Sequence, residues 1–221
     1  MKLLLNALAK YILGLLLVCL LLFPAAGTVA WFNAWLFIAL LFLPMLVLGI
    51  VLYLRAPALL EKRLKSREKE TTQKTVVLVS ALLFMGGFIL AGLDYRKGWS
   101  AVPSWLVAAS ALLLLVSYGL YAEVMRENAY LSRTVEVQQG QKLVDTGLYA
   151  VVRHPMYAVT ILLFMSIPLV LGSWLSFAVF LLYPAAIVLR IGNEEKVLEA
   201  GLEGYREYKQ KVKYRLLPGI W

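Results

Sequence analysis

Long apolar segments dominate this chain and restrict its fold more than any other feature. Six of them reach or approach the length of about 20 apolar residues that the hydrocarbon core of a bilayer requires: residues 3–23, 31–54, 75–93, 101–122, 156–171 and 174–190. A bilayer admits only helices or closed barrels, and runs this long without alternation exclude a barrel. The sequence therefore predicts an all-α integral membrane protein with about five to six transmembrane helices.

The last two apolar segments are separated only by Gly172 and Ser173. So short a junction predicts a helical hairpin, whose first arm is marginal for a full span. No internal repeat and no long linker is evident, so we expect a single membrane domain over residues 1–221. Residues 1–124 would supply four transmembrane helices, and residues 125–221 would supply a polar connection, the hairpin and a tail.

Basic residues are distributed unevenly between the spans of this chain, whose formal net charge is +9. If both termini face the cytosol, most basic residues fall inside, namely those of segments 55–74, 126–153 and 190–215. Only Arg96 and Lys97 then fall outside. This asymmetry satisfies the positive-inside rule and predicts cytosolic N and C termini. It indicates that the charge sets topology and attracts anionic lipids, and we expect no nucleic-acid partner.

Histidine and cysteine are too few for metal chemistry. Cys19 is the only cysteine, His154 is the only histidine, and no HExxH, GxSxG or P-loop motif is present. We therefore expect no metal site. Chemistry would have to come from a cofactor or substrate held by Arg, Glu, Tyr and one His. Transfer of an already activated alkyl group suits that inventory, because it needs mainly positioning and desolvation.

Two polar clusters stand where apolar segments meet water: GLYAVVRHPMY at 147–157 and RIGNEE at 190–195. Charged residues beside membrane spans are either structural anchors or parts of a site. We interpret the two clusters as one site.

The alternative interpretation of these residues is structural. Arg153 and Arg190 would be boundary arginines that extend to the interface, and His154 would cap a helix. Glu194 and Glu195 would be acids in the first turn of a tail helix.

The tail from residue 191 onward begins acidic and becomes basic, an order that suits the dipole of a helix. Gly201 and Gly204 weaken the middle of such a helix. Apolar residues at three- and four-residue steps predict that the tail folds back over the cytosolic face. Within this stripe, Tyr205 and Tyr208 are interpreted as packing residues.

GLYAVVRHPMY, followed by R-x-x-x-E-E-x-x-L and then by GYREYKQKV, resembles the carboxy-terminal signature of the isoprenylcysteine carboxyl methyltransferase and phospholipid methyltransferase superfamily. The signature covers residues 126–218. The resemblance implies an integral membrane transferase that uses S-adenosylmethionine (S-adenosyl-L-methionine). Its cofactor pocket would face the cytosol, between the connection before the hairpin and a cytosolic C-terminal helix.

Matched position by position, the resemblance implies a set of cofactor-binding residues: Gln138, Gln141, Lys142, Leu143, Val144, Tyr149, His154, Pro155, Met156, Tyr157, Glu194 and Glu195. It also implies catalytic roles for Arg190, placed toward the acceptor, and for Arg153.

The chemistry of the cofactor agrees with this assignment. S-adenosylmethionine carries an ammonium, a carboxylate and a sulfonium, so its site needs a glutamate and helix-start amides together. Pro155 suits the first turn of a helix that His154 would cap. Arg190 lies four residues before Glu194, on the same helical face. There it would hold an acceptor carboxylate through two parallel hydrogen bonds, and an ionised carboxylate needs no general base.

The acceptor expected from this reasoning is a lipid or lipidated molecule that enters from the bilayer. An isoprenylcysteine-type carboxylate is favoured, and a phospholipid amine, which would need a base, stays open. Two departures from the family pattern, Val159 for a glycine and Lys211 where relatives have arginine, leave their effect on activity open.

Two other functions compete with methyl transfer. The ending VKYRLLPGIW resembles the tail of NADPH-dependent membrane sterol reductases, although the Glu pair does not fit their pattern. A non-catalytic membrane scaffold is the third candidate. The compact chain favours a prokaryotic cytoplasmic membrane, and the oligomeric state is left open.

Two expectations concern the outer side of the membrane. Four tryptophans at predicted span ends indicate an interfacial belt: Trp31, Trp35, Trp99 and Trp105. Asp94 is expected to pair with Arg96 or Lys97.

Overall fold

The computed structural model describes residues 2–64, 71–132 and 134–221, and every regular element within them is helical. The elements are α1 (Lys2–Ala26), α2 (Phe32–Arg55), α3 (Pro57–Leu64), α4 (Thr71–Lys97), α5 (Ser104–Glu127), the 3-10 turn η1 (Gly147–Ala150), α6 (Pro155–Leu171), α7 (Trp174–Phe180), α8 (Tyr183–Gly201) and α9 (Tyr205–Lys211). The predicted all-α class is confirmed.

Within the described chain, five helical stretches are long and apolar enough to cross a membrane: α1, α2, α4, α5 and the α7–α8 pair, which runs from Trp174 to Gly201. Helix α6 is also apolar but has only 17 residues. Many large side chains on the outer surface of the bundle are hydrophobic; Leu13 and Leu20, for example, are each 67% exposed. Such a surface would be unstable in water, and it fits a multi-pass membrane protein.

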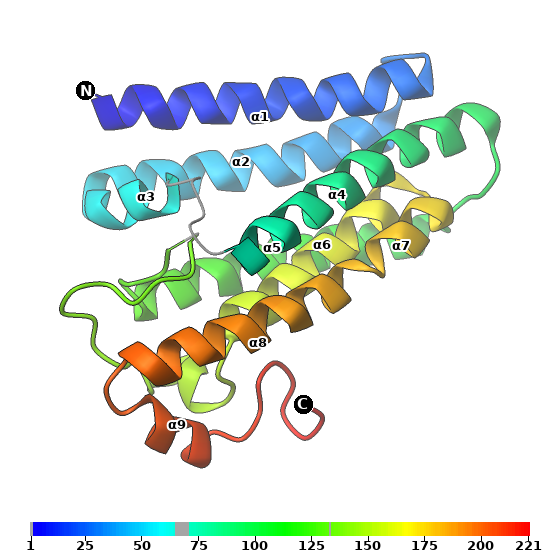
Figure 1. Cartoon of the computed structure of the whole chain (residues 1–221). Coiled ribbons are helices and arrows are strands. Elements are labelled where there is room, and N and C mark those ends of the chain that lie inside the picture. Colours follow the sequence, from blue (N-terminus) through cyan, green and yellow to red (C-terminus); the bar gives the residue numbers. More distant parts are fainter. Residues whose placement is uncertain (1, 65–70, 133) are drawn as a thin grey trace.

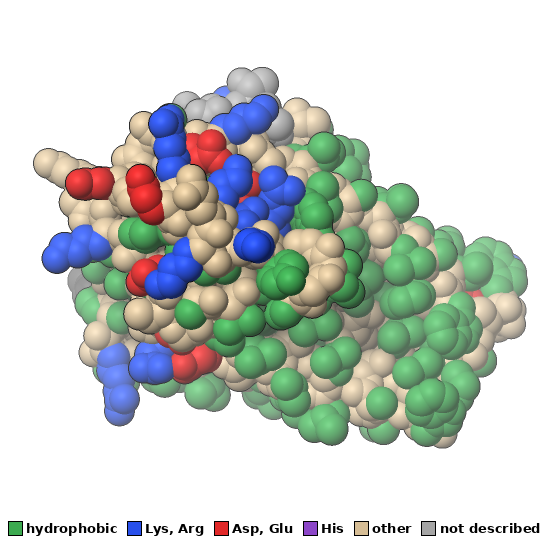
Figure 2. Space-filling view, turned by 90° about the horizontal axis from the view of Figure 1, so that it is seen from below, with side chains coloured by type: hydrophobic (Ala, Val, Ile, Leu, Met, Phe, Trp, Pro, Cys, Tyr) green, Lys and Arg blue, Asp and Glu red, His purple; other side chains and the backbone are tan. Residues whose placement is uncertain are grey.

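The long helices run back and forth along one axis, so their connections collect at two ends of the bundle (Figure 1). The polar end holds α3, η1, α9 and the connection 128–153. The loop end holds the turns at 27–31, 98–103 and 172–173. Figure 2 shows charged side chains gathered at one end of the molecule, with hydrophobic side chains over most of the remaining face.

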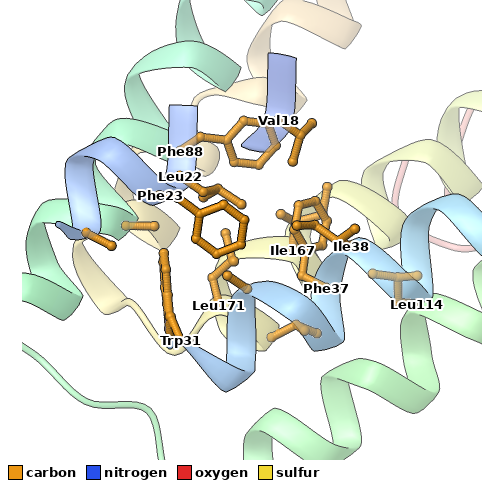
Figure 3. Close-up of a cluster of buried hydrophobic side chains, with 14 of the residues drawn as sticks. Val18, Leu22, Phe23, Trp31, Phe37, Ile38, Phe88, Leu114, Ile167 and Leu171 are labelled. Carbon is orange, nitrogen blue, oxygen red and sulfur yellow. The ribbon is translucent and has the colours of Figure 1, made fainter. Parts of the chain in front are cut away.

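The main hydrophobic core lies toward the loop end (Figure 3). Leu22 of α1, Phe37 of α2 and Ile167 of α6 are each 1% exposed or less. Trp31 also belongs to this core: it is 2% exposed and stacks on Tyr95 with ring centroids 4.8 Å apart. The expected place of Trp31 in an interfacial belt is therefore wrong, because packing against α4 buries its ring.

Helices α1 and α4 approach each other closely where α4 has a glycine. A Cβ atom on Gly92 would lie 2.7 Å from both the Ala25 Cβ and the Leu22 carbonyl oxygen. Membrane helices lack a strong hydrophobic drive to associate, so small residues that permit close backbone contact stabilise their packing.

The junction between α6 and α7 forms the predicted hairpin. Gly172 has φ +85° and ends α6, and Ser173 caps α7 by accepting a hydrogen bond from the Ser176 amide at 3.0 Å. Asp94 at the end of α4 accepts hydrogen bonds from the Ser173 hydroxyl and from the Ser100 amide and hydroxyl, the last two at 2.7 and 2.6 Å. The expected pairing of Asp94 with a neighbouring cation is therefore wrong, since these serines satisfy its carboxylate.

The tail differs from the single helix that its charge order predicts. Helix α8 continues through the two acids to Gly201, the backbone turns extended at Leu202, and α9 begins only after Gly204, whose φ is +78°. Glu194 and Glu195 therefore lie in the second half of α8. The alternative that they are first-turn acids of a separate helix is wrong, because the α8 face carrying Ile187, Ile191 and Leu198 continues past them.

Candidate functional site

A cavity of about 600 Å³ extends from the polar end into the bundle. Ligand pockets typically measure about 300–1,000 Å³. The polar lobe of this cavity is lined from the connection, α6, α8 and α9, by Gln141, Lys142, Tyr149, Arg153, His154, Tyr157, Arg190, Glu194, Tyr205 and Tyr208. The apolar lobe lies among the membrane helices and is lined by Leu41, Met45, Val76, Phe84, Leu163 and Ile187, with other apolar neighbours.

A tyrosine joins the two charged residues that α8 contributes to the polar lobe. The Tyr157 hydroxyl donates a hydrogen bond to Glu194 Oε2 and accepts one from Arg190 Nε at 2.8 Å. The Arg190 guanidinium also lies over the Tyr157 ring, 5.8 Å from its centroid. These contacts fix the orientation of both charged groups, which lie four residues apart on one face of α8 as predicted.

The start of α6 is held by the tail. The Arg153 amide donates to the Tyr214 carbonyl and the His154 amide to the Arg215 carbonyl, both at 2.9 Å. The Arg153 guanidinium donates through Nη1 to the carbonyls of Val212 and Lys213 at 2.7 and 2.8 Å. Since the first amides of a helix have no partner within it, the tail supplies acceptors at the position where the cavity wall begins.

Glu195 is the centre of a buried ion cluster. Its Oε1 accepts from Arg153 Nε at 2.8 Å and lies 3.3 Å from His154 Nε2. Its Oε2 accepts from the Arg215 guanidinium at 3.0 and 3.1 Å, and Lys209 Nζ lies 3.7 Å away. A carboxylate that is 4% exposed at the side chain is stable only with such partners. Glu195 therefore ties α6, α8 and the tail together.

His154 stands at the N-cap position of α6, with Pro155 in the first turn as expected. Its ring makes no capping hydrogen bond and instead contacts Glu195. The proposed capping role of the imidazole is therefore wrong, because the buried carboxylate draws the ring toward α8.

Tyr149 forms one wall of the polar lobe through its own contacts with α5 and α9. Its hydroxyl accepts from Asn128 Nδ2 at 3.0 Å, and its carbonyl accepts from the Tyr208 hydroxyl at 2.7 Å. Burial raises the pKa of the Tyr149 phenol, so it stays neutral. The preceding Gly147 has φ +55°, and a Cβ atom there would lie 1.6 Å from Glu127 Oε1. Only glycine fits this turn, which brings the wall to the cavity.

The connection before η1 reaches the cavity through a turn. The Gln138 amide donates to Gln141 Oε1 at 2.9 Å, and the Gln141 amide donates to the Gln138 carbonyl at 3.0 Å. This turn leads into Lys142, Leu143 and Val144, which line the cavity together with Gln141.

Most residues that the sequence placed in the site do line one cavity: Gln141, Lys142, Leu143, Val144, Tyr149, Arg153, His154, Met156, Tyr157, Arg190 and Glu194. Gln138, Pro155 and Glu195 are neighbours of these residues in sequence but are not part of the lining. Val159 packs with Met156 and Leu59 beside the cavity, and the exposed Lys211 lies 3.8 Å from Asp145.

The amino-terminal helices also contribute to the cavity, which the sequence pattern did not predict. Arg63 of α3 donates to the Tyr121 hydroxyl of α5, and both side chains line the cavity with Asn128. The available signal was a tyrosine on the same helix face as other polar residues near the end of α5. Among the described residues, no three His, Cys, Asp or Glu side chains gather to hold a metal ion.

Comparison with known proteins concerns the carboxy-terminal half of the chain. Residues 105–203 match the sequence profile of the phospholipid methyltransferase family. The uncharacterized protein YpbQ of Bacillus subtilis is 32% identical over 97 residues, a stretch that covers 43% of this chain and 58% of that protein. The profile match runs from α5 to the end of α8 and includes both polar clusters. The segment that supplies most of the polar lobe is therefore the part of the chain that is similar to the phospholipid methyltransferase family.

Proposed function

We propose that this protein transfers a methyl group from S-adenosylmethionine to a lipid-like or lipidated acceptor at the cytosolic face of a membrane. The observation that carries the proposal is the two-lobed cavity. Its polar lobe presents fixed charges of both signs at the end of the bundle, and its apolar lobe continues among helices that face lipid. A polar methyl donor and a hydrophobic methyl acceptor can thus meet in one cavity.

The polar lobe fits the cofactor by its donors and acceptors. S-adenosylmethionine has an ammonium, a carboxylate and a sulfonium, and the lobe offers the Glu194 carboxylate, the Lys142 ammonium and the Gln141 amide. A buried hydroxyl without a partner, that of Tyr205, also lies in this lining. When bound, the cofactor supplies a methyl group on sulfur, and the carbon–sulfur electron pair stays on the sulfur as the methyl group leaves.

The residues proposed to bind the cofactor are those of the connection, η1, the start of α6 and α8: Gln141, Lys142, Leu143, Val144, Tyr149, His154, Met156, Tyr157 and Glu194. Gln138, Pro155 and Glu195 would position them from behind. Arg153, which is bound to Glu195 and to two tail carbonyls, would act in the same way and would not touch the acceptor.

Arg190 is proposed to orient the acceptor. It lines the cavity with residues of the apolar lobe such as Ile187, and Tyr157 fixes the plane of its guanidinium. A planar guanidinium binds a carboxylate through parallel hydrogen bonds. A carboxylate acceptor is already ionised at neutral pH, so the protein has no proton to remove. This favours an isoprenylcysteine-type carboxylate over a phospholipid amine.

The proposed orientation places the polar end in the cytosol, where S-adenosylmethionine is made available. Basic side chains at this end, including Lys62, Arg126 and Lys213, would then meet the anionic headgroups of a prokaryotic cytoplasmic membrane.

Binding of S-adenosylmethionine to the detergent-purified protein tests the proposal. We expect saturable binding by the wild type, binding at least about tenfold weaker by Glu194→Gln, as for a lost charged hydrogen bond, and unchanged binding by Glu203→Gln, an exposed acid outside the cavity lining. Absence of binding by folded wild type, or equal binding by both variants, would refute the cofactor assignment.

Methyl transfer to lipid extracts then identifies the acceptor. A methyl ester releases methanol in mild base, whereas an N-methyl group does not. Base-labile product supports a carboxylate acceptor, and base-stable product refutes it.

A further inference from the structure

The hydroxyl group of Tyr205 is not explained by packing. Its side chain is 3% exposed and lies in the cavity lining, and its oxygen has no hydrogen-bond partner among the described residues. A buried hydroxyl in this state has lost its hydrogen bonds to water without replacing them. A phenylalanine would pack equally well against Leu202 and Val212.

Tyr208, one turn further along α9, shows the contrast. The two rings lie 5.8 Å apart and belong to the same hydrophobic cluster. The Tyr208 hydroxyl donates to the Tyr149 carbonyl at 2.7 Å, so its polar atom has a structural function. The Tyr205 side chain also lines the cavity, but its buried hydroxyl makes no such bond among the described residues, which points to a ligand.

The charges around Tyr205 specify the kind of ligand. Burial and the carboxylates of Glu195 and Glu194 raise the pKa of the Tyr205 phenol, so the group stays protonated and its oxygen remains a neutral acceptor. Glu195 is neutralised by Arg153 and Arg215, whereas Glu194 lines the cavity, where its described hydrogen bond comes from the neutral Tyr157 hydroxyl. The combination of a phenol oxygen and a carboxylate suits a cation with several N–H donors.

We infer that the Tyr205 oxygen and the Glu194 carboxylate together bind the ammonium group of S-adenosylmethionine. This inference rests on the proposed function and adds a ligand group to a side chain for which the sequence predicted only packing. It makes α9 part of the binding site as well as a cover over it. It also explains why the unpartnered hydroxyl is retained at a buried position.

A comparison of two ligands on two variants tests the inference. S-adenosylhomocysteine carries the ammonium group, and methylthioadenosine lacks the whole amino-acid part. We expect Tyr205→Phe to bind S-adenosylhomocysteine about tenfold more weakly, as for a hydrogen bond to a charged group, and to bind methylthioadenosine like the wild type. Without ligand, Tyr205→Phe should unfold at the same temperature as the wild type or higher, whereas Tyr208→Phe should unfold at a lower temperature, because only Tyr208 loses a hydrogen bond.

Other results of this comparison would contradict the role inferred for Tyr205. Equal loss for both ligands would place Tyr205 against the nucleoside, and no loss for either would remove Tyr205 from the site. Both results would overturn the inference while the proposed function stands. If wild type binds neither ligand, both the function and the inference fail. Should Tyr205→Phe not fold, Glu194→Gln must show the same dependence on the ammonium group, and its absence would overturn the inference.

Discussion

Replacing Glu195 by glutamine removes the charge at the centre of the buried cluster while keeping the size of the side chain. Arg153, 4% exposed at its side chain, would lose its counter-charge. Removing one partner of a buried pair costs about 3–5 kcal/mol. Arg153 keeps two carbonyl acceptors in the tail, and water can solvate Lys209, which is 37% exposed. We therefore expect the lower end of that range, about 3 kcal/mol.

Thermal unfolding in detergent, followed by circular dichroism, measures this effect. At about 2–4 °C per kcal/mol for a protein of this size, Glu195→Gln should lower the Tm by about 6–12 °C. The matched control is Glu194→Gln, the neighbouring residue with the same chemical change, whose described partner is the Tyr157 hydroxyl. It should shift the Tm by less than about 4 °C, the equivalent of one ordinary hydrogen bond. Equal shifts for the two variants would show that Glu195 does not hold the cluster.

Three further changes test other parts of the structure. Tyr157→Phe should lower the rate of methyl transfer about tenfold, because the arginine and the glutamate of the polar lobe lose their shared hydroxyl; a kcat unchanged from wild type would exclude this positioning role. Asp94→Asn should lower the free energy of unfolding by about 1–3 kcal/mol, as for charged hydrogen bonds, and leave S-adenosylmethionine binding unchanged, because it lies at the loop end; equal stability by thermal unfolding would contradict this. Gly92→Ala should lower the free energy of unfolding by about 1–3 kcal/mol, because the added methyl group overpacks against Ala25. Gly86→Ala, where a Cβ atom meets nothing within 4 Å, should lower it by less than about 1 kcal/mol.

The apolar runs were sufficient to predict the helices because a membrane leaves few alternatives for such segments. The hairpin followed from the two residues at 172–173, since no longer connection was available. The break after Gly201 was harder to predict. An isolated glycine in a helical pattern is often tolerated, and here the chain leaves α8 at the extended Leu202, while Gly204 with its positive φ precedes α9.

The sequence predicted most of the residues that line the candidate site, but it did not predict the different roles of neighbouring residues. Glu194 and Glu195 are chemically identical, and about 100° of rotation per residue places one in the cavity and the other in the ion cluster. Sequence pattern cannot tell which acid meets the tail, because this depends on where Arg153 and Arg215 lie in space. The apolar lobe could not be predicted either, because the sequence does not distinguish an apolar residue that faces lipid from one that lines a cavity, as Met45 and Phe84 do.

Tyr205 illustrates a different limit. Its spacing in the apolar stripe predicted a packing residue, and its ring does pack with Leu202 and Tyr208. The pattern describes the ring, whereas the hydroxyl has a separate environment that only the arrangement of α9 over the cavity reveals.

The hydrogen bonds between the start of α6 and residues 212–215 set an order of events during biosynthesis. The ribosome delivers the chain from its amino terminus, so α1 to α5 are made well before these tail residues. Until then, the amides of Arg153 and His154 lack the acceptors that the tail supplies. The ion cluster around Glu195 is likewise incomplete until Arg215 has been made, because Arg215 donates to Glu195 Oε2. Insertion of the first helices and completion of the cavity are therefore separate stages, and the proposed cofactor pocket is complete only when the second stage is finished.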